Sequence, residues 1–315
     1  DLSEIARRTE EAWQRGATEI CLQGGIHPNY TGDTYVDILR TVKGAAPDIH
    51  VHAFSPLEVW QGAATLDVPL VDFLARLQNE GLSSLPGTAA EILDDSVRAV
   101  LCPDKINTEQ WLEVMRSAHS IGLRSTATIM FGHLERSTSW AKHLIRVRDL
   151  AAQTGGFTEF VPLPYVHMES PLYRQGLSRT GPTWREAMLM HAVSRLVLHP
   201  HISNIQASWV KLGPVGVSAC LAGGANDIGG TLMNESITRA AGAAFGEELP
   251  PAQMEALIRS CDRLPRQRTT FYGTPAQERI DASFAAEALM PKVETRTARA
   301  RPRGPRSIPV RFGTA

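Results

Sequence analysis

The sequence predicts an α/β protein whose parallel strands form a full or partial barrel. Short apolar segments of strand length alternate with amphipathic segments of helical period through at least five units. This alternation is typical of a parallel sheet, because the crossover between parallel strands is usually a helix. Polar and glycine-rich residues follow the strand-like segments, at the end where barrel enzymes build active sites. The absence of a Gly-x-Gly-x-x-Gly with a downstream acid disfavours a dinucleotide-binding fold.

Local patterns predict each element in turn. Apolar or alternating runs predict strands at 18–22, 49–54, 82–85, 124–131, 157–163 and 205–210. Amphipathic periods and capping residues predict helices at 2–15, 34–42, 71–79, 108–118, 137–152, 183–198, 213–221 and 252–259, with one more starting at Pro56 and a helical turn at 89–93. Residues 1–275 are expected to form one barrel domain with a C-terminal extension. Residues 276–315 are expected to be a disordered tail that becomes rich in arginine and proline.

Composition narrows the class of protein. Hydrophobic residues make up 43% of the chain and charged residues 21%, which is typical of a soluble globular protein. The formal net charge of -1 argues against broad binding to nucleic acid. No apolar run approaches the ~18 residues of a membrane span. Four scattered cysteines without metal-site spacing are expected to be buried thiols in a reducing cytoplasm.

The stretch Gln23-Gly24-Gly25 ends the first strand-like segment and is the first candidate binding loop. Its backbone amides could recognise the amino or carboxylate group of a ligand at close range. The alternative is a tight turn that requires positive φ angles.

Three histidines, His27, His52 and His133, follow or end strand-like segments. They lack the spacing of a metal-binding set, so general acid–base or substrate-orienting roles are preferred. Trp209 and Lys211 could hold a planar substrate, although a tryptophan is more often part of a core.

Acidic residues give further candidates, each with an alternative. Glu91 either favours a helix dipole or accepts from a ribose hydroxyl or an ammonium group. Glu159 lies in an apolar strand and is therefore either paired in the barrel interior or directed at the site. Asp227 follows Asn226 in a glycine-rich loop, where a ligand contact and an ordinary turn are both open. The basic stretch 266–268 could contact an anion, but a solvated surface is the preferred interpretation.

Several strings match one known family in the same order: Ile20–Pro28, His52–Pro56, Pro86–Leu93, Phe157–Pro164 and Gly223–Thr231. From Leu2 to about Gly273 the chain resembles the radical S-adenosylmethionine enzymes of deazaflavin and menaquinone biosynthesis. It is most similar to the tyrosine-using subunit of FO synthase, or to the C-terminal half of the fused enzyme. The resemblance implies a partial (βα)6-type barrel that lacks the first strand and the cluster loop, with a C-terminal extension.

The resemblance also implies an activity. Members of this family bind a 4Fe–4S cluster through a Cys-x-x-x-Cys-x-x-Cys loop and cleave S-adenosylmethionine to a 5′-deoxyadenosyl radical. In the members that this chain resembles most, the radical attacks tyrosine, and the hydroxybenzyl fragment joins 5-amino-6-ribitylaminouracil on the way to FO, the chromophore of coenzyme F420. The implied partners are these two substrates, the other FO synthase subunit or domain, and an electron donor.

Site residues are carried over by motif position. Gln23, Gly24 and Gly25 would meet the methionyl amino group, and Glu91 would contact ribose or that amino group. The adenine would be flanked by Met130 to Gly132 and closed over by Val161, Pro162 and Pro164. The candidate catalytic residues on the substrate side are His27, His52, His133 and Asp227.

The cluster motif does not occur in this sequence. The resemblance therefore implies that the cluster loop lies upstream of residue 1 and that the chain as given makes no radical. Two alternatives stay open: a menaquinone-pathway enzyme acting on a futalosine-type substrate, and a non-catalytic barrel that binds a small molecule or a partner.

Overall fold

The computed structural model describes residues 1–233, 235, 237–287 and 289. Its elements in chain order are α1 (Leu2–Gln14), β1 (Glu19–Leu22), α2 (Gly32–Ala45), β2 (His50–Ala53), α3 (Pro56–Leu66), α4 (Leu70–Asn79), β3 (Ser84–Leu85), α5 (Asp95–Leu101), α6 (Thr108–Ser120), β4 (Arg124–Phe131), α7 (Ser137–Thr154), β5 (Phe157–Pro164), α8 (Pro171–Arg174), α9 (Trp184–Leu198), α10 (Trp209–Ala222), α11 (Ile237–Ala240), α12 (Pro251–Arg259) and α13 (Gln277–Phe284).

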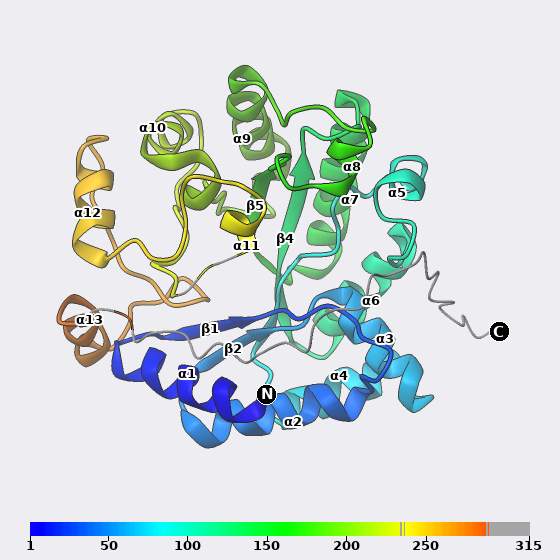
Figure 1. The fold of residues 1–315 in the computed structure, drawn as a ribbon, viewed down its shortest axis with the longest axis vertical. Coiled ribbons are helices and arrows are strands. Elements are labelled where there is room, and N and C mark those ends of the chain that lie inside the picture. The colour runs from blue at the N-terminus through cyan, green and yellow to red at the C-terminus, as the bar shows by residue number, and fades with distance from the viewer. Residues whose placement is uncertain (234, 236, 288, 290–315) are drawn as a thin grey trace.

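The strands form a single parallel sheet in the order β1-β2-β3-β4-β5. They turn from the horizontal β1 and β2 to the upright β4 and β5 in Figure 1, so the sheet curls into a half-barrel. Two isolated parallel bridges, Phe160 with Ile205 and Gln206 with Asp227, extend the curl beyond β5. The predicted partial α/β barrel is therefore confirmed. The strand expected at 205–210 is shorter than predicted, because α10 already begins at Trp209.

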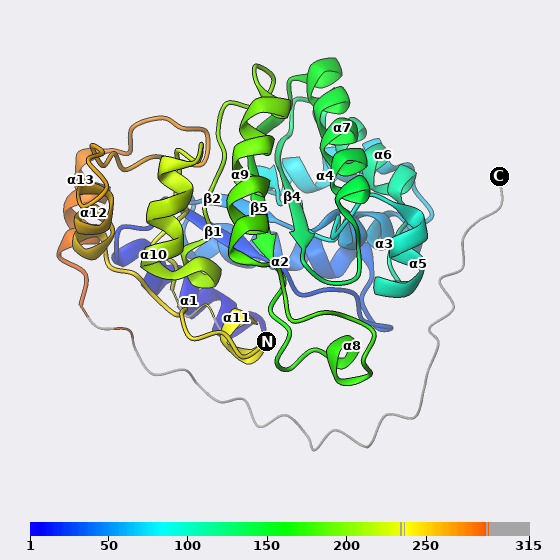
Figure 2. The ribbon, with the colours of Figure 1, turned by 90° about the horizontal axis from the view of Figure 1, so that it is seen from above.

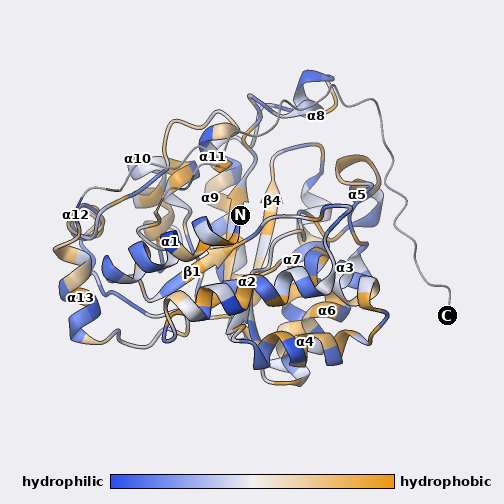
Figure 3. Ribbon diagram, turned by 60° about the horizontal axis from the view of Figure 1, so that its bottom comes forward, coloured by the Kyte–Doolittle hydropathy of each residue, from blue (hydrophilic) through white to orange (hydrophobic). Residues whose placement is uncertain are grey.

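Helices cover the convex side of the sheet and bury its apolar face. One core cluster joins β1, β2 and β3 to α2, α3 and α4, with Leu39, Phe73 and Leu77 almost fully buried. A second cluster joins β4 and β5 to α6, α7 and α9 around Trp111 and Phe160. Figure 3 shows the orange, hydrophobic strands β1 and β4 among helices of mixed polar and apolar colour.

Side chains alternate between the two faces of the sheet along each strand, and this alternation determines which residues lie on the concave side. Val51 and Ala53 of β2 pack into the convex core, so His50 and His52 face the concave side. In β4, Ile129 and Phe131 are core residues, so Met130 between them faces the concave side. The concave face therefore carries the side chains of His50, His52 and Met130.

Local sequence patterns predicted the bounds of some helices and strands closely. Residues 124–131 form β4 as predicted. Thr183 is the N-cap of α9, with a capping box completed by Glu186.

The C-terminal boundary differs from the expectation. The disordered tail cannot begin at residue 276, because Gln277–Phe284 forms α13. Figures 1 and 2 both place α13 beside α12 at one edge of the molecule. The Arg279 guanidinium donates to the Trp13 carbonyl oxygen at 2.7 Å and lies 4.1 Å from its ring centroid, which ties α13 to α1. The remaining part of the expected tail, residues 288 and 290–315, lies outside the described residues. Among the helices that the structure describes, none is long and apolar enough to cross a membrane.

Candidate active site

The loops after the strands meet at one edge of the half-barrel, because all five strands run in the same direction. This carboxyl-terminal edge is where α/β barrels carry their active sites. The loops that follow β1 to β5 begin at Gln23, Phe54, Pro86, Gly132 and Tyr165. The sequence predicted these tips, and the structure brings them to one edge.

A buried carboxylate that the sequence did not single out holds the first tip. Oε1 of Glu58 accepts from the backbone N–H groups of Gly24 at 2.9 Å and Gly25 at 3.0 Å. Its Oε2 accepts from the N–H and the hydroxyl of Ser55, each at 2.7 Å. Glu58 is the N3 residue of the capping box of α3 and is only 1% exposed. The Ser-x-x-Glu pattern at 55–58 signals such a cap, but nothing local in it points to a glycine pair 34 residues away.

Glu58 changes which groups of the loop can meet a ligand. Its two hydrogen bonds use the glycine amides that were expected to face a ligand, so those amides are not available. Within the described chain, no hydrogen bond ends on the carbonyl oxygens of Gln23, Gly24 or Gly25. A Cβ added at Gly25 would meet nothing within 4 Å, and one at Gly24 would meet only Glu58 Oε1 at 3.9 Å. The loop therefore offers open backbone acceptors, which suit an ammonium group.

Glu91 lies outside any helix, contrary to the helical turn expected at 89–93. Its φ is +45°, and its carbonyl oxygen accepts from the Met130 N–H at 2.7 Å. α5 begins only at Asp95. The Glu91 carboxylate forms an ion pair with Lys105. A ligand contact at Glu91 would therefore be shared with this lysine.

The other predicted S-adenosylmethionine contacts divide between the two faces of the sheet. Met130 and Val161 lie on the concave face, since their strand neighbours Phe131 and Phe160 are core residues. The same alternation places Pro162 and Pro164 on the convex face. A Cβ added at Gly132 would lie 2.3 Å from Pro182, and its φ is +94°, so packing alone accounts for this glycine. These assignments therefore stay predictions, with Met130 and Val161 better placed than the rest.

The three candidate histidines occupy different environments. His52 faces the concave side, and its Nδ1 lies 2.7 Å from the Ser84 hydroxyl, which is also 2.7 Å from His50 Nε2. Burial lowers the pKa of His52, so the ring is neutral at pH 7. His27 is exposed and packs its ring 5.1 Å from that of Tyr30.

His133 is placed unlike the other two, because it is fully buried. Its Nδ1 lies 2.7 Å from Glu135 Oε2, and its Nε2 lies 3.0 Å from the Met130 carbonyl oxygen. The side chain of Glu135 also accepts from the Trp140 indole at 2.7 Å. Both ring nitrogens of His133 thus have protein partners, which favours a structural role.

Asp227 lies away from the strand tips, in a charged cluster inside the half-barrel. Its Oδ2 accepts from Arg268 Nε, and its Oδ1 accepts from the Gly229 N–H at 2.6 Å. Arg268 also donates to Glu159 Oε2 at 3.0 Å, and the Tyr272 hydroxyl donates to the same oxygen at 2.7 Å. Glu159 is therefore paired in the barrel interior, which was one of its two predicted positions. Arg268 is not the solvated surface residue that was expected.

Two carboxylates share one guanidinium in this cluster. Burial, with the nearby charge of Asp227, raises the pKa of Glu159 to about 7, against the pull of Arg268. The cluster is thus poised to hold one proton near neutral pH. An acid within an apolar strand signals a buried cation, but the sequence does not say which one.

The segment that carries Arg268 also closes the opposite end of the half-barrel. The Thr270 hydroxyl donates to Glu19 at the start of β1. The Phe271 ring lies 4.9 Å from that of His50 and 5.7 Å from the Arg124 guanidinium. These contacts reach the amino-terminal ends of β1, β2 and β4, so this end is structural and the strand tips form the candidate site.

The cysteines do not form a metal site. The residues are Cys21 on β1, Cys102 after α5, Cys220 in α10 and Cys261 after α12. Within the described ranges, no group of three His, Cys, Asp or Glu side chains could hold a metal ion. Of the four, only Cys220 is fully buried and Cys21 is exposed, so the expectation of four buried thiols was wrong.

The sequence of this chain matches a known protein family and several known proteins. Residues 154–279 match the family model described as the CofH/MqnC C-terminal region. The chain is 48% identical over 269 residues to the 5-amino-6-(D-ribitylamino)uracil–L-tyrosine 4-hydroxyphenyl transferase of Methanopyrus kandleri, covering 85% of this chain and 73% of that protein. It is 46% identical over 292 residues to the FO synthase of Streptomyces avermitilis, covering 93% of this chain but 34% of that protein. The chain thus spans about a third of the length of the FO synthases that it matches.

A solved structure supports the fold alone. The crystal structure of methylornithine synthase (PylB) superposes with a TM-score of 0.60 at 16% identity, covering 90% of this chain and 76% of that one. Fold and strand-tip site together define a partial α/β barrel enzyme-type scaffold with its candidate site at the carboxyl-terminal ends of the strands. Within this class, the chain belongs to the family of the Methanopyrus transferase and the matching part of the FO synthases.

Proposed function

We propose that this half-barrel belongs to an enzyme that uses S-adenosylmethionine to transfer the hydroxybenzyl fragment of L-tyrosine to 5-amino-6-(D-ribitylamino)uracil in FO synthesis. The observation that carries the proposal is the 48% identity to the Methanopyrus transferase over 73% of that protein. The proposed reaction takes place at the carboxyl-terminal ends of the strands.

The first tip fits the methionyl end of S-adenosylmethionine. An ammonium group needs acceptors, and the open carbonyl oxygens of Gln23, Gly24 and Gly25 supply them. Glu58 fixes their direction by accepting from the amides of the same loop. When bound, S-adenosylmethionine supplies one-electron chemistry that no side chain of the described chain supplies.

The described cysteines do not fit a 4Fe–4S cluster, because a cluster needs several thiolates in one place. We therefore assign no reaction step to a cluster on these residues. The proposed enzyme holds its cluster through ligands other than these four cysteines, and it receives its electron from a separate donor.

His52 is the best-placed candidate to orient a substrate. It lies on the concave face, Ser84 fixes one ring nitrogen, and the lowered pKa leaves the ring neutral at pH 7. A neutral imidazole can accept a proton from a substrate N–H or O–H group. We further propose that the other FO synthase subunit or domain takes up the product.

The test is an activity assay on the protein as its gene encodes it. The protein is reconstituted anaerobically with iron and sulfide and then given S-adenosylmethionine, tyrosine and the ribityl-diaminouracil. We expect 5′-deoxyadenosine and a tyrosine-derived adduct of the uracil. The proposal is overturned if a loaded cluster forms but no 5′-deoxyadenosine does. It is overturned in favour of the menaquinone pathway if turnover requires a futalosine-type substrate.

A further inference from the structure

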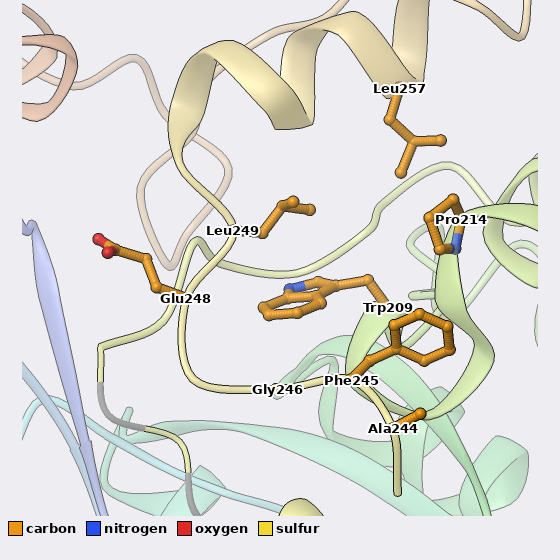
Figure 4. Close-up of a pocket in the computed structure, with 8 residues that line it drawn as sticks. All are labelled: Trp209, Pro214, Ala244, Phe245, Gly246, Glu248, Leu249 and Leu257. Carbon is orange, nitrogen blue, oxygen red and sulfur yellow. The ribbon is translucent and has the colours of Figure 1, made fainter.

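An apolar pocket beside α10 serves packing rather than chemistry. Figure 4 shows the Trp209 indole in this pocket, beside Leu249 and Phe245. Glu248 is the charged residue of the pocket lining, and its carboxylate forms an ion pair with Arg15. Trp209 is thus a core residue. The concave face of the sheet differs from this pocket, because β2 carries two histidines there.

A single hydroxyl joins the two histidines of β2. The Ser84 Oγ lies 2.7 Å from His52 Nδ1 and 2.7 Å from His50 Nε2. Ser84 is the register partner of His52 on β3, and it is only 1% exposed. Within the described chain, the Ser84 hydroxyl makes no other hydrogen bond. The three side chains therefore form one chain of hydrogen bonds that is closed to water at its centre.

The number of protons in this chain of hydrogen bonds determines its arrangement. A hydroxyl donates one hydrogen bond, and a neutral imidazole carries one N–H. Burial lowers the pKa of both rings, to about 4 for His50, so both rings are neutral at pH 7. Ser84 therefore donates to one ring and accepts from the other, because two N–H groups directed at its oxygen would leave its own proton without an acceptor. The tautomers of the two rings are thus linked, and His52 presents a bare Nε2 when Ser84 donates to His50.

The outer nitrogen of each ring is open. His52 Nε2 and His50 Nδ1 have no hydrogen-bond partner among the described residues, and neither is one of the buried polar atoms that lack a partner. Each nitrogen can therefore exchange a proton with a ligand or with solvent. His52 is 7% exposed, whereas His50 is half-buried beside the Phe271 ring. A positive charge consequently costs less on His50 than on His52.

Charged residues on neighbouring segments act on both rings. Glu19 is the register partner of His50 on β1, and its charge favours a proton on either ring. Arg268 disfavours a proton on His52, and Lys43 disfavours one on His50. Glu19 thus supplies the negative charge that offsets an imidazolium at His50.

We propose that Ser84 and His50 form a proton relay behind His52. When a substrate N–H or O–H group gives its proton to His52 Nε2, the Nδ1 proton of His52 passes to Ser84 Oγ, and the Ser84 hydroxyl proton passes to His50 Nε2. The positive charge then lies on His50, on the strand next to Glu19, and His52 stays neutral. His50 releases its Nδ1 proton to solvent, so the transfer exchanges one linked pair of tautomers for the other. This inference rests on the proposed function in taking tyrosine or the uracil as the source of the proton.

Turnover by variants of the reconstituted full-length protein tests the relay. In His50→Gln the glutamine oxygen can still accept from Ser84, but it cannot take up the proton. We expect His50→Gln to lower kcat roughly ten- to hundredfold and to leave KM for tyrosine unchanged, because His52 still receives the first proton. Ser84→Ala should lower kcat to a similar extent, and Ser84→Thr, which keeps the hydroxyl, should retain most of it.

His119→Gln is the matched control. The His119 ring also lies between two hydroxyls, Thr154 Oγ1 and Ser125 Oγ, each at 2.7 Å, and burial likewise lowers its pKa to about 4. It belongs to α6 on the convex side, so His119→Gln should leave kcat unchanged. A wild-type kcat in His50→Gln would overturn the relay. An equal loss of kcat in His119→Gln would also overturn it, since the effect would then come from packing.

Nitrogen NMR of the protein with isotopically labelled histidine tests the linked tautomers without turnover. We expect one proton on the pair formed by His50 Nε2 and His52 Nδ1, and we expect the two rings to change tautomer independently in Ser84→Ala. Independent tautomers in the wild type would refute the relay. If the protein turns over only a futalosine-type substrate and His50→Gln slows that turnover, the function in FO synthesis falls and the relay stands. If neither substrate is turned over, the spectra decide: linked tautomers support the relay and independent ones refute it.

Discussion

Replacing Glu58 by glutamine removes the charge that holds the loop at Gln23–Gly25. The wild-type carboxylate accepts four hydrogen bonds, two from the amides of Gly24 and Gly25 and two from Ser55. A glutamine keeps one oxygen, and its NH2 group must face N–H or O–H donors on the other side. Either orientation of the amide loses two charge-assisted bonds.

The size of the effect follows from this count. Each hydrogen bond to a charged group is worth about 1.5–3 kcal/mol. The glycine loop is exposed, so its freed amides can bind water and regain part of the loss. We therefore expect the free energy of unfolding to fall by about 2 kcal/mol. We expect a larger local effect, in which the loop loses its fixed geometry while the core stays folded.

Two measurements read these effects separately. Amide hydrogen exchange should accelerate at Gly24 and Gly25 in Glu58→Gln, and titration should show weaker S-adenosylmethionine binding. Glu113→Gln on the exposed side of α6 makes the same chemical change and should alter neither quantity. Unchanged exchange at the two glycines would refute the role of Glu58. Faster exchange with unchanged S-adenosylmethionine affinity would refute the role of the loop in binding.

Three further predictions follow from other contacts. Glu91→Gln removes a carboxylate at the candidate site and should weaken S-adenosylmethionine binding; unchanged affinity removes Glu91 from the site. Glu159 has a folded-state pKa of about 7, above its ordinary 4.5, so its contribution to stability is full below pH 4.5 and is lost as pH rises through 7. The stability of Glu159→Gln should therefore rise relative to that of the wild type between pH 5 and 7.5, by at most about 1.4 kcal/mol per pH unit. Urea unfolding measures this, and a stability difference that stays constant with pH would show that Glu159 does not hold the proton. Gly87→Ala should destabilise the protein by about 2–4 kcal/mol, because the new Cβ would lie 2.5 Å from the Thr126 carbonyl oxygen. The control is Gly44→Ala in α2, where the new Cβ would meet nothing within 4 Å. Thermal melts of both variants should show that this control is neutral or stabilising.

Much of the fold could be predicted because its signals are local. The period of β4 and the capping box of α9 lie within a few residues of the elements that they define. The helices between the strands predict that the strands are parallel, and parallel strands place their tips at one edge of the sheet. Predictions failed where a local signal competed with a distant contact. Glu91 suits the start of a helix, but its backbone is held in a left-handed conformation beside Met130 of β4.

The candidate site was predicted less completely. The loop at Gln23–Gly25 follows β1 as the sequence predicted, and His52 lies within β2, one residue before its end. His133 and Asp227 lie in the loops where the sequence predicted them, but their polar atoms are paired with Glu135 and Arg268. A sequence shows that a polar residue follows a strand, whereas its availability depends on which partner the fold brings to it.

By itself the sequence predicted a full or partial barrel of parallel strands and a glycine loop at its first tip, since residue periodicity and capping act within one or two turns of chain. Only the tertiary structure showed that Glu58 holds that loop and that Arg268 pairs with Glu159. These pairs are separated by 34 and 109 residues along the chain. Their charges meet because the curled sheet brings distant segments together, and a buried charge is tolerated only where such a partner arrives.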